Sequence, residues 1–140
     1  MKKYELVRVR DVMKHEFDVV DGLATVADGL RHMKHLDTKA LVVRKRDDAD
    51  EYGIVEVEDI ATGVLAKNKS PERVNIYEIM EKPLIGIDPN MDIRYCARLF
   101  ERYRLNRAAV IEEREVIGIV SYADIVIKGM KRLLDEQPEA

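Results

Sequence analysis

The sequence of 140 residues is short of several features, and each shortage excludes a class of protein. With a single cysteine, Cys96, no internal disulfide is possible, which favours a cytoplasmic location. No apolar run reaches the roughly 18 residues of a membrane helix, and the charged opening residues do not form a signal peptide. The formal net charge of −3 lacks the basic excess of nucleic-acid modules. Neither a membrane nor a nucleic acid is therefore an expected partner.

Signatures of catalysis are missing as well. There is no glycine-rich phosphate loop, and no nucleophile, histidine and acid stand at a spacing that suggests a catalytic group. His32 and His35 lie three residues apart on one expected helix, yet no acid or cysteine completes an evident metal site. Cys96 falls on the inward stripe of another expected helix, as a small buried hydrophobic residue would. We predict no catalytic residue, no metal site and no enzymatic activity.

What the chain does contain is a duplication. Val12 and Met13 recur 67 residues later as Ile79 and Met80, and the pattern Gly-Ile-Val-x-x-x-Asp-Ile begins at residue 53 and again 65 residues later at residue 118. Three residues at helical spacing also match across the copies: Val26 with Ile93, Leu30 with Ala97, and Met33 with Phe100. We expect each matched pair to occupy the same environment. A lone unit of about 60 residues is marginally stable, so pairing offers both copies a shared core.

The first copy is predicted to follow the order β-α-β-β-α. Its expected elements are a helical turn ending near Met13, a strand at 17–20, a helix at 25–36 capped by Thr25, a hairpin of strands at 40–43 and 52–57, and a helix at 59–66. The hairpin turn at 44–51 carries the basic run Arg44, Lys45 and Arg46, which the acids of the same turn largely cancel.

The second copy repeats this order. Its expected elements are a helical turn at 76–80, a strand at 84–87, a helix at 92–104, a hairpin of strands at 108–111 and 116–120, and a final helix capped by Ser121. The boundaries that follow are a first repeat at 7–66, a linker at 67–75 that is polar and broken by proline, and a second repeat at 76–135.

The duplicated order, with its Val/Ile-Met opening and Gly-Ile-Val-x-x-x-Asp-Ile close, resembles the cystathionine-β-synthase (CBS) domain pair over about residues 7–130. The resemblance implies an α/β fold of two βαββα units packed as a pseudo-twofold pair, known as a Bateman-type module. It also implies a regulatory module that binds AMP, ADP, ATP or S-adenosylmethionine in a cleft between the repeats. Such a ligand would be regulatory rather than an obligatory cofactor, and the regulated protein is unknown. No enzyme or transporter domain is attached, so we expect a freestanding module.

Ser121 and Asp124 lie where the last strand turns into the final helix, at the family's Gly-x-x-Ser/Thr-x-x-Asp pattern. The resemblance places Asp124 on the ribose hydroxyls and Ser121 near ribose or phosphate. A carboxylate accepts two hydrogen bonds from a vicinal diol, and free N–H groups at a helix start attract phosphate. The same tetrapeptide is also a helix-capping pattern that needs no ligand, and both roles are compatible.

Four further residues complete the predicted nucleotide site. Arg107 precedes a strand that begins with Ala108, at a position where family members carry a basic residue facing the phosphates. Lys82 is a second available cation, and Leu84 enters the strand where the family packs adenine. For Leu84 and its first-copy counterpart Phe17, plain core packing is an equal alternative.

The first copy departs from the pattern. Glu56 stands where Ser121 stands in the second copy, and Glu58 adds a carboxylate beside Asp59. Three acids suit the start of a helix but oppose a phosphate, because like charges about 4 Å apart repel by roughly 1 kcal/mol even in water. Asp59 and Phe17 therefore mark a weaker second site.

The sequence supports two hypotheses about function. The first is a sensor of an adenosyl ligand, and the alternative is a ligand-free scaffold for dimerisation and interaction. In both we expect a homodimer formed by helices rather than by the charged hairpin tip, because a charged tip is costly to desolvate. The final helix carries more apolar residues than one inward face needs: Ile125, Val126, Ile127, Met130, Leu133 and Leu134.

Overall fold

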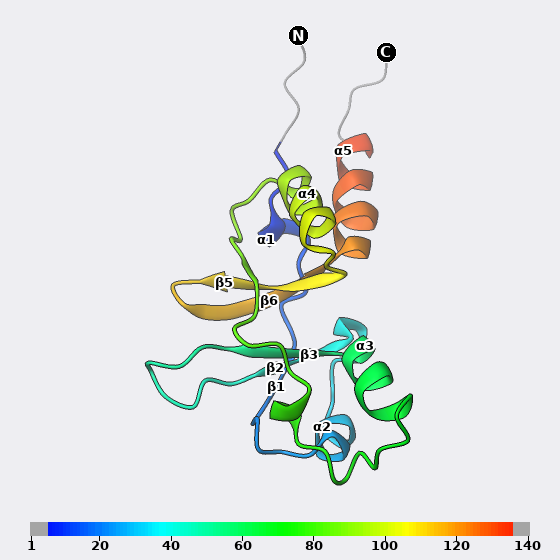
Figure 1. Ribbon diagram of the computed structural model, residues 1–140. Coiled ribbons are helices and arrows are strands. Elements are labelled where there is room, and N and C mark those ends of the chain that lie inside the picture. Colours follow the sequence, from blue (N-terminus) through cyan, green and yellow to red (C-terminus); the bar gives the residue numbers. More distant parts are fainter. Residues whose placement is uncertain (1–5, 136–140) are drawn as a thin grey trace. The chain divides into compact units, whose positions relative to one another are not determined.

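A computed structural model describes residues 6–135 and confirms the α/β class with a duplicated βαββα order (Figure 1). The chain forms two compact units. Of the described residues, 6–15 and 85–135 form one unit, and Glu16–Leu84 forms the other. The first is called here the outer unit and the second the inner unit, after their places in the sequence.

The inner unit holds a three-stranded sheet. Its strands β1 (Asp18–Val20), β2 (Ala40–Val43) and β3 (Gly53–Glu56) lie in that order, with β1 parallel and β3 antiparallel to β2. All four residues of β2 are buried, as its uninterrupted apolar run predicts. The helices are α2 (Val26–Arg31) and α3 (Val57–Ile60), and α3 continues as a π-helical stretch, Ala61–Leu65. Short 3₁₀ turns occupy Leu36–Thr38 and Ile76–Glu78.

The outer unit repeats the arrangement. Strands β4 (Gly86–Ile87), β5 (Arg107–Glu112) and β6 (Glu115–Ser121) again pair parallel and then antiparallel. Its helices are α1 (Val9–Val12), α4 (Ile93–Tyr103) and a final helix in which a π-helical stretch, Asp124–Met130, leads into α5 (Lys131–Asp135). The cap at the start of α4 is Asp92, whose side chain accepts a hydrogen bond from the Arg94 N–H at 2.9 Å.

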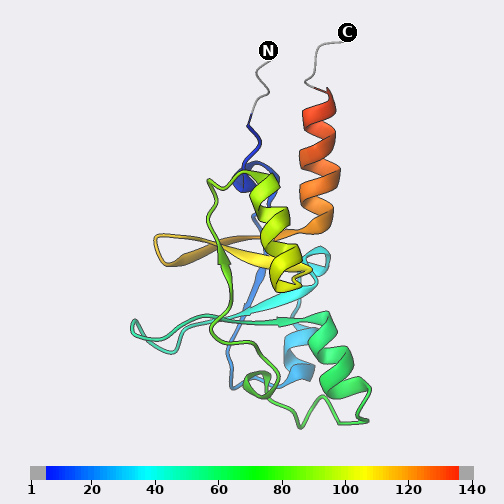
Figure 2. The ribbon, with the colours of Figure 1, turned by 45° about the horizontal axis from the view of Figure 1, so that its top comes forward.

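The compact units do not coincide with the sequence repeats, because the opening segment of each copy packs with the body of the other. Figure 2 shows α1, drawn in blue, beside α4 of the outer unit. Lys14 forms an antiparallel bridge with Ile119, with N–H···O distances of 2.8 and 3.0 Å. In the inner unit Glu81 bridges Ile54 in the same way, at 2.9 Å in both directions. The repeat boundaries at 7–66 and 76–135 remain a prediction about the sequence.

The helix predicted at 25–36 is too long, because α2 ends at Arg31. The Asp18 carboxylate accepts hydrogen bonds from the Lys34 and His35 N–H groups, both at 2.9 Å, and this holds the chain in a turn instead of a further helical turn. The expected match of Leu30 with Ala97 is also wrong, since Leu30 is 44% exposed whereas Ala97 packs against a core.

The stripe of α2 that faces the sheet uses a glycine that the apolar pattern could not mark. Gly29, the counterpart of buried Cys96, is itself buried, and a Cβ on Gly29 would lie 3.0 Å from the Leu41 Cδ1 atom. The small residue lets α2 approach β2 closely. The match of Val26 with Ile93 is confirmed, since both are buried.

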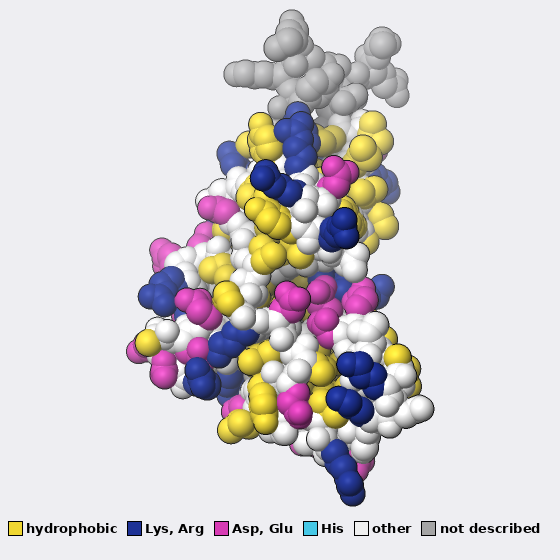
Figure 3. Space-filling model, in the orientation of Figure 1, with side chains coloured by type: hydrophobic (Ala, Val, Ile, Leu, Met, Phe, Trp, Pro, Cys, Tyr) yellow, Lys and Arg dark blue, Asp and Glu magenta, His cyan; other side chains and the backbone are white. Residues whose placement is uncertain are grey.

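The final helix leaves much of its apolar surface exposed. Figure 3 shows hydrophobic side chains gathered over the helix that ends in α5. The exposed residues on it are Val126, Ile127, Met130 and Leu134. Within residues 6–135 no helix is both long enough and apolar enough to cross a membrane.

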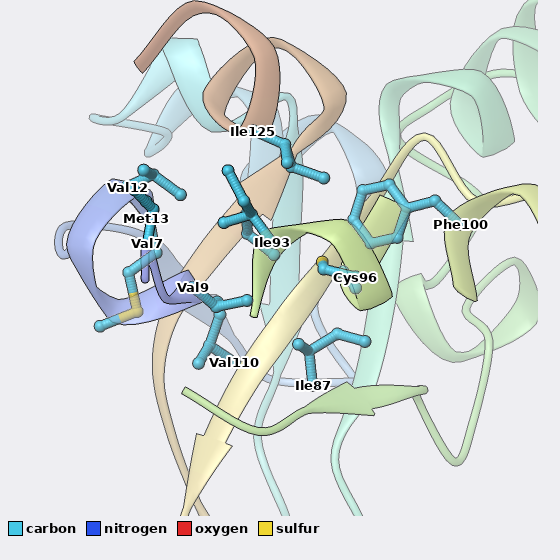
Figure 4. Close-up of a cluster of buried hydrophobic side chains, with 12 residues drawn as sticks. Val7, Val9, Val12, Met13, Ile87, Ile93, Cys96, Phe100, Val110 and Ile125 are labelled. Carbon is cyan, nitrogen blue, oxygen red and sulfur yellow. The ribbon is translucent and has the colours of Figure 1, made fainter. Parts of the chain in front are cut away.

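The core of the outer unit draws on residues from both ends of the sequence. Val9 and Val12 of α1 pack with Ile93 and Phe100 of α4 and with Ile125 of the final helix (Figure 4). These side chains are almost fully buried. The opening segment is therefore part of this core and not a peripheral extension.

The repeated glycine of the Gly-Ile-Val motif permits this exchange. A Cβ on Gly118 would lie 2.6 Å from the Lys14 carbonyl oxygen and 2.8 Å from the Met13 Sδ atom. A Cβ on Gly53 would lie 3.0 Å from the Met80 Sδ atom, in the equivalent place of the inner unit. The two motifs that recur in the sequence, Val/Ile-Met and Gly-Ile-Val, therefore contact each other.

We predict that Gly118→Ala destabilises the protein by about 1–3 kcal/mol, the usual cost of forcing volume into a packed site. The Lys14 carbonyl that the new methyl group would strike accepts a bridge hydrogen bond and cannot move away cheaply. Denaturant unfolding measures the change. Gly22→Ala is the matched control, because its Cβ would make ordinary contacts at 3.5 Å, and it should cost less than about 0.5 kcal/mol. Equal costs for the two variants would contradict this role of Gly118.

Candidate functional site

The second-copy turn, residues 121–124, has the geometry of a helix cap. The Ser121 N–H and Oγ–H both donate to the Asp124 Oδ2 atom at 3.0 Å. The Asp124 N–H lies 3.2 Å from the Ser121 Oγ atom, which accepts in return. The capping interpretation of Ser-x-x-Asp therefore holds, and it fixes the direction of the Asp124 carboxylate.

Two lysines neutralise Asp124, which is only 2% exposed. The Lys14 ammonium group donates to both carboxylate oxygens, at 2.7 and 2.9 Å, and the Lys128 Nζ atom lies 3.1 Å from Oδ1. Burial acts to raise the pKa of Asp124, but the hydrogen bonds from Lys14, Lys128 and Ser121 outweigh it and lower the pKa below its ordinary value. The result is a permanent anion held between two cations at the start of a helix.

The outer unit brings Arg107 and Ala108 to the same turn. Arg107 is paired with Ser121 across the β5–β6 ladder, and Ala108 is paired with Val120. Both β5 residues are buried, with Arg107 8% exposed. Four of the six residues predicted for the nucleotide site thus lie in one unit. They lie at one end of the β5–β6 ladder and at the start of the helix that follows it.

The other predicted residues belong to the inner unit. The Lys82 ammonium group forms an ion pair with Asp50 at 2.8 Å, and the Leu84 N–H donates to the Tyr52 carbonyl at 3.0 Å. Phe17, assigned to the weaker site, is half-buried in this unit. The assignment of Lys82 and Leu84 to the site of Ser121 remains a prediction.

The first-copy turn, residues 56–59, has the same cap but a different charge. The Glu56 N–H donates to the Asp59 Oδ2 atom at 2.8 Å. The counterpart of Lys14 is Glu81, and that of Lys128 is Gly63, so neither cation is duplicated. Asp59 nevertheless borders a pocket of about 310 Å³ into which the linker contributes Lys67 and Lys69. Sequence reasoning counted only the acids at this turn and missed these two lysines.

The sequence analysis missed Lys128 and Lys14 at the second-copy turn, and Lys14 is the one more distant in sequence. It lies 110 residues from Asp124, and only the exchange of opening segments brings the two together. A signal was present, because the duplication matches Lys14 with Glu81 and so marks a reversal of charge.

The cysteine and the two histidines considered above lie in packing or local polar contacts. Cys96 is fully buried, and burial raises the pKa of its thiol to about 11, so the thiolate is a minor form at neutral pH. The His32 Nδ1 atom contacts the Asp28 carbonyl oxygen at 2.9 Å, whereas the His35 Nδ1 atom lies 3.6 Å from Glu16. Over residues 6–135 no three acids, cysteines or histidines are grouped as a metal site would need.

Comparison with known proteins decides the family. The family profile described as CBS domain matches residues 76–130. The hexameric CBS-CP12 protein from bloom-forming cyanobacteria, whose structure is solved, is 35% identical, with a TM-score of 0.86, over 96% of this chain and 76% of that chain. This chain belongs to the CBS domain family. The solved relative extends the match over the first copy, which the profile alone does not reach.

Two further similarities bear on this CBS pair. Uncharacterized protein MJ0450 of Methanocaldococcus jannaschii is 25% identical over 109 residues, and the match covers 77% of this chain but 59% of that protein. The CBS domain pair of protein MJ0100, solved in complex with 5′-methylthioadenosine and S-adenosyl-L-methionine, is 22% identical, with a TM-score of 0.75, over 91% of this chain and 99% of that chain. At this identity the second similarity shows the fold alone.

We predict that Asp124→Asn flattens the acid limb of the stability curve. Because the folded pKa of Asp124 is lower than the unfolded value of about 3.9, its ion pairs stabilise fully above that value, and the contribution is lost as the pH falls through the folded pKa. The variant should lose about 2–3 kcal/mol at neutral pH, where Lys14 and Lys128 remain without their anion. Thermal unfolding between acid and neutral pH measures both effects.

Asp59→Asn is the matched control for this prediction, because it makes the same change at the equivalent cap. No ion pair joins Asp59 to any of residues 6–135, so its neutral-pH loss should be smaller. Parallel stability curves for wild type and Asp124→Asn would show that the lysines contribute nothing.

Proposed function

We propose that this CBS pair is a regulatory module that binds a phosphorylated adenosyl ligand at the second-copy turn. The observation that carries the proposal is the buried Asp124 carboxylate, which faces two lysine ammonium groups at the start of a helix. A ribose diol and a phosphate need these two kinds of partner, an anionic acceptor and nearby cations.

The ligand would compete with an existing ion pair. Both Asp124 oxygens accept from Lys14, and these are the atoms that two ribose hydroxyls would use. Displaced from the carboxylate, Lys14 is available to a phosphate, together with Lys128 and the helix N–H groups. The exchange of partners keeps Asp124 hydrogen-bonded throughout, so it avoids the cost of an unpaired buried charge.

The competition between the ligand and Lys14 for Asp124 also suggests how ligand binding could regulate a partner protein. Lys14 belongs to the opening segment, and its backbone is bridged to Ile119. A ligand that releases the Lys14 side chain removes one of several attachments of this segment, next to the backbone bridge. A change of shape or assembly, read by a partner protein, is the expected output.

The bound ligands of the related pair support the adenosyl class. The MJ0100 pair was solved with two adenosyl compounds, neither of which carries a phosphate. We favour a phosphorylated ligand for this chain because Lys14, Lys128 and Arg107 gather positive charge at the turn. AMP, ADP and ATP all fit this description. S-adenosylmethionine is the comparison ligand, because it has the same ribose diol but no phosphate.

A ligand-free scaffold is the second candidate, favoured by one observation. The apolar stripe of the final helix, defined by Val126, Ile127, Met130 and Leu134, is exposed in the single chain. Such surfaces mark contacts between proteins, and the related CBS-CP12 protein is hexameric. A ligand-binding module can also self-associate, so the assembly state does not separate the sensor from the scaffold. Titration with adenosyl ligands does separate them.

We predict that calorimetric titration detects AMP, ADP or ATP at millimolar affinity or better, which corresponds to about −4 kcal/mol or more negative. Asp124→Asn should weaken binding by about tenfold to a hundredfold, the cost of losing a charged hydrogen-bond partner. Lys14→Gln should weaken the three nucleotides but not S-adenosylmethionine, which has no phosphate.

Asp59→Asn is the control for this titration and should leave nucleotide affinity within about twofold, because the proposed site does not use Asp59. Loss of binding in Asp59→Asn with binding intact in Asp124→Asn would move the site to the pocket beside Lys67 and Lys69. Absence of binding by every adenosyl ligand would leave the scaffold function.

We also predict a homodimer or a larger assembly at tens of micromolar, within the usual affinity range of specific complexes. Met130→Glu should shift the protein toward monomer, because it places a charge in the apolar stripe. Leu65→Glu is the matched control: Leu65 is the first-copy counterpart of Met130 and is also exposed on its helix, at 76% against 57%, without the surrounding stripe. Light scattering measures the mass, and a monomeric wild type would refute the assembly.

A further inference from the structure

A second pocket lies in the inner unit, at the edge of the sheet opposite the first-copy turn. Its volume is about 810 Å³. It is bordered where β1 and β2 end, by residues 21–23 and 43–46, and by residues 77–82 of the following segment. Leu23, Val43, Tyr77 and Met80 give it an apolar wall. A flat apolar group of a small molecule suits this wall.

The remaining wall is basic. Arg44, Lys45, Arg46 and Lys82 border the pocket, against a single acid, Asp21. The Asp21 carboxylate accepts from the Leu23 N–H at 2.8 Å and so serves the turn of its own chain segment. The Arg44 guanidinium has no hydrogen bond or ion pair with any of residues 6–135. The pocket therefore offers more positive charge than its own wall neutralises.

A carboxylate from the hairpin loop occupies part of this basic wall. The Asp50 side chain, 9% exposed, lies 2.8 Å from the Lys82 Nζ atom and 3.0 Å from the Arg46 Nε atom. Its Oδ2 atom also accepts from the Arg46 N–H at 2.9 Å. Hydrogen bonds from Arg46 and then Lys82 hold the pKa of Asp50 far below its usual range, so pH does not release it near neutrality.

The loop places Asp50 in this position before any ligand arrives. The Ala49 N–H donates to the Asp47 side chain at 2.9 Å, and the Asp50 N–H donates to the Asp47 carbonyl at 3.1 Å. Three donors converge on one carboxylate oxygen, an arrangement that a phosphate oxygen reproduces. The Arg46 partner is 80% exposed, so water screens its ion pair with Asp50 and an external anion can reach it and compete.

We propose that the pocket binds a small phosphorylated molecule with a flat apolar body, and that Asp50 is an internal competitor for its phosphate. The phosphate takes the contacts of Asp50 with Arg46 and Lys82, and Arg44 adds a further cation. The apolar body lies against Tyr77 and Met80. The proposal does not rest on ligand binding at the second-copy turn, because Ser121, Asp124 and Lys14 do not border this pocket.

Phenyl phosphate is the probe, because it joins a phosphate to a flat apolar ring and carries no ribose. Titration of the ¹⁵N-labelled full chain, followed by amide chemical shifts, should perturb Gly22, Leu23 and Tyr77. Asp50→Asn should tighten binding by about fivefold, the scale of a surface ion pair. Its amide oxygen still accepts from the Arg46 N–H, so the loop keeps its shape. Lys82→Gln should weaken binding by about fivefold.

Two matched controls isolate these effects. Asp48→Asn makes the same change of charge in the same loop, and Lys34→Gln makes the same change as Lys82→Gln on a residue that does not border the pocket. Both side chains are exposed to solvent and neither borders the pocket, so both substitutions should leave the affinity within about twofold. Inorganic phosphate should bind more weakly than phenyl phosphate, since it does not use the apolar wall.

Other results would overturn the proposal. Equal effects of Asp50→Asn and Asp48→Asn would show that Asp50 is no competitor. Chemical shift changes confined to residues 121–128 would place the probe at the second-copy turn instead. If the nucleotide titration fails while the pocket amides respond to phenyl phosphate, the pocket stands and the adenosyl proposal falls.

Discussion

The exchange of opening segments is the constraint on which both units depend. Lys14 bridges Ile119 in one unit, and Glu81 bridges Ile54 in the other. Glycine at 118 and at 53 leaves room for these crossings. Since each unit contains residues of both copies, neither copy completes a unit alone, and a lone copy of about 60 residues would in any case be marginal. The exchange packs the Val/Ile-Met motif of each copy against the Gly-Ile-Val motif of the other copy. This contact explains why both motifs recur although they lie far apart in the sequence.

Lys14 joins this constraint to the candidate site. Its backbone forms the bridge, while its side chain forms the ion pair with Asp124. The equivalent residue of the other copy, Glu81, can form the bridge, which needs only backbone atoms, but not the ion pair. The bridge therefore sets no requirement on the side chain at this position, and the two copies carry different ones. The two turns kept their helix caps and diverged in charge: Ser121, Lys14 and Lys128 at one, Glu56, Glu81 and Gly63 at the other.

The sequence predicts best what depends on local pattern. The hairpin strands, the caps at Thr25 and Ser121 and the burial of Val26, Ile93 and Cys96 follow from apolar periodicity and capping chemistry. The end of α2 does not, because Asp18 stops it through hydrogen bonds from residues 34 and 35, which no local pattern reveals. The Asp124–Lys14 and Asp50–Lys82 pairs were missed for a related reason. Their partners lie 110 and 32 residues apart, so only the folded chain brings them together.

These two ion pairs share a position in the chain. The chain passes from one unit to the other after His15 and again after Leu84. Lys14 and Lys82 each lie within three residues of such a passage, and each is neutralised by an acid of the unit to which it belongs. In both proposals the ligand anion captures a lysine next to a passage between the units, beside a backbone bridge that stays in place. The two sheets and their bridges are alike, so the different charges of the two copies, and not their folds, would decide which anions each unit binds.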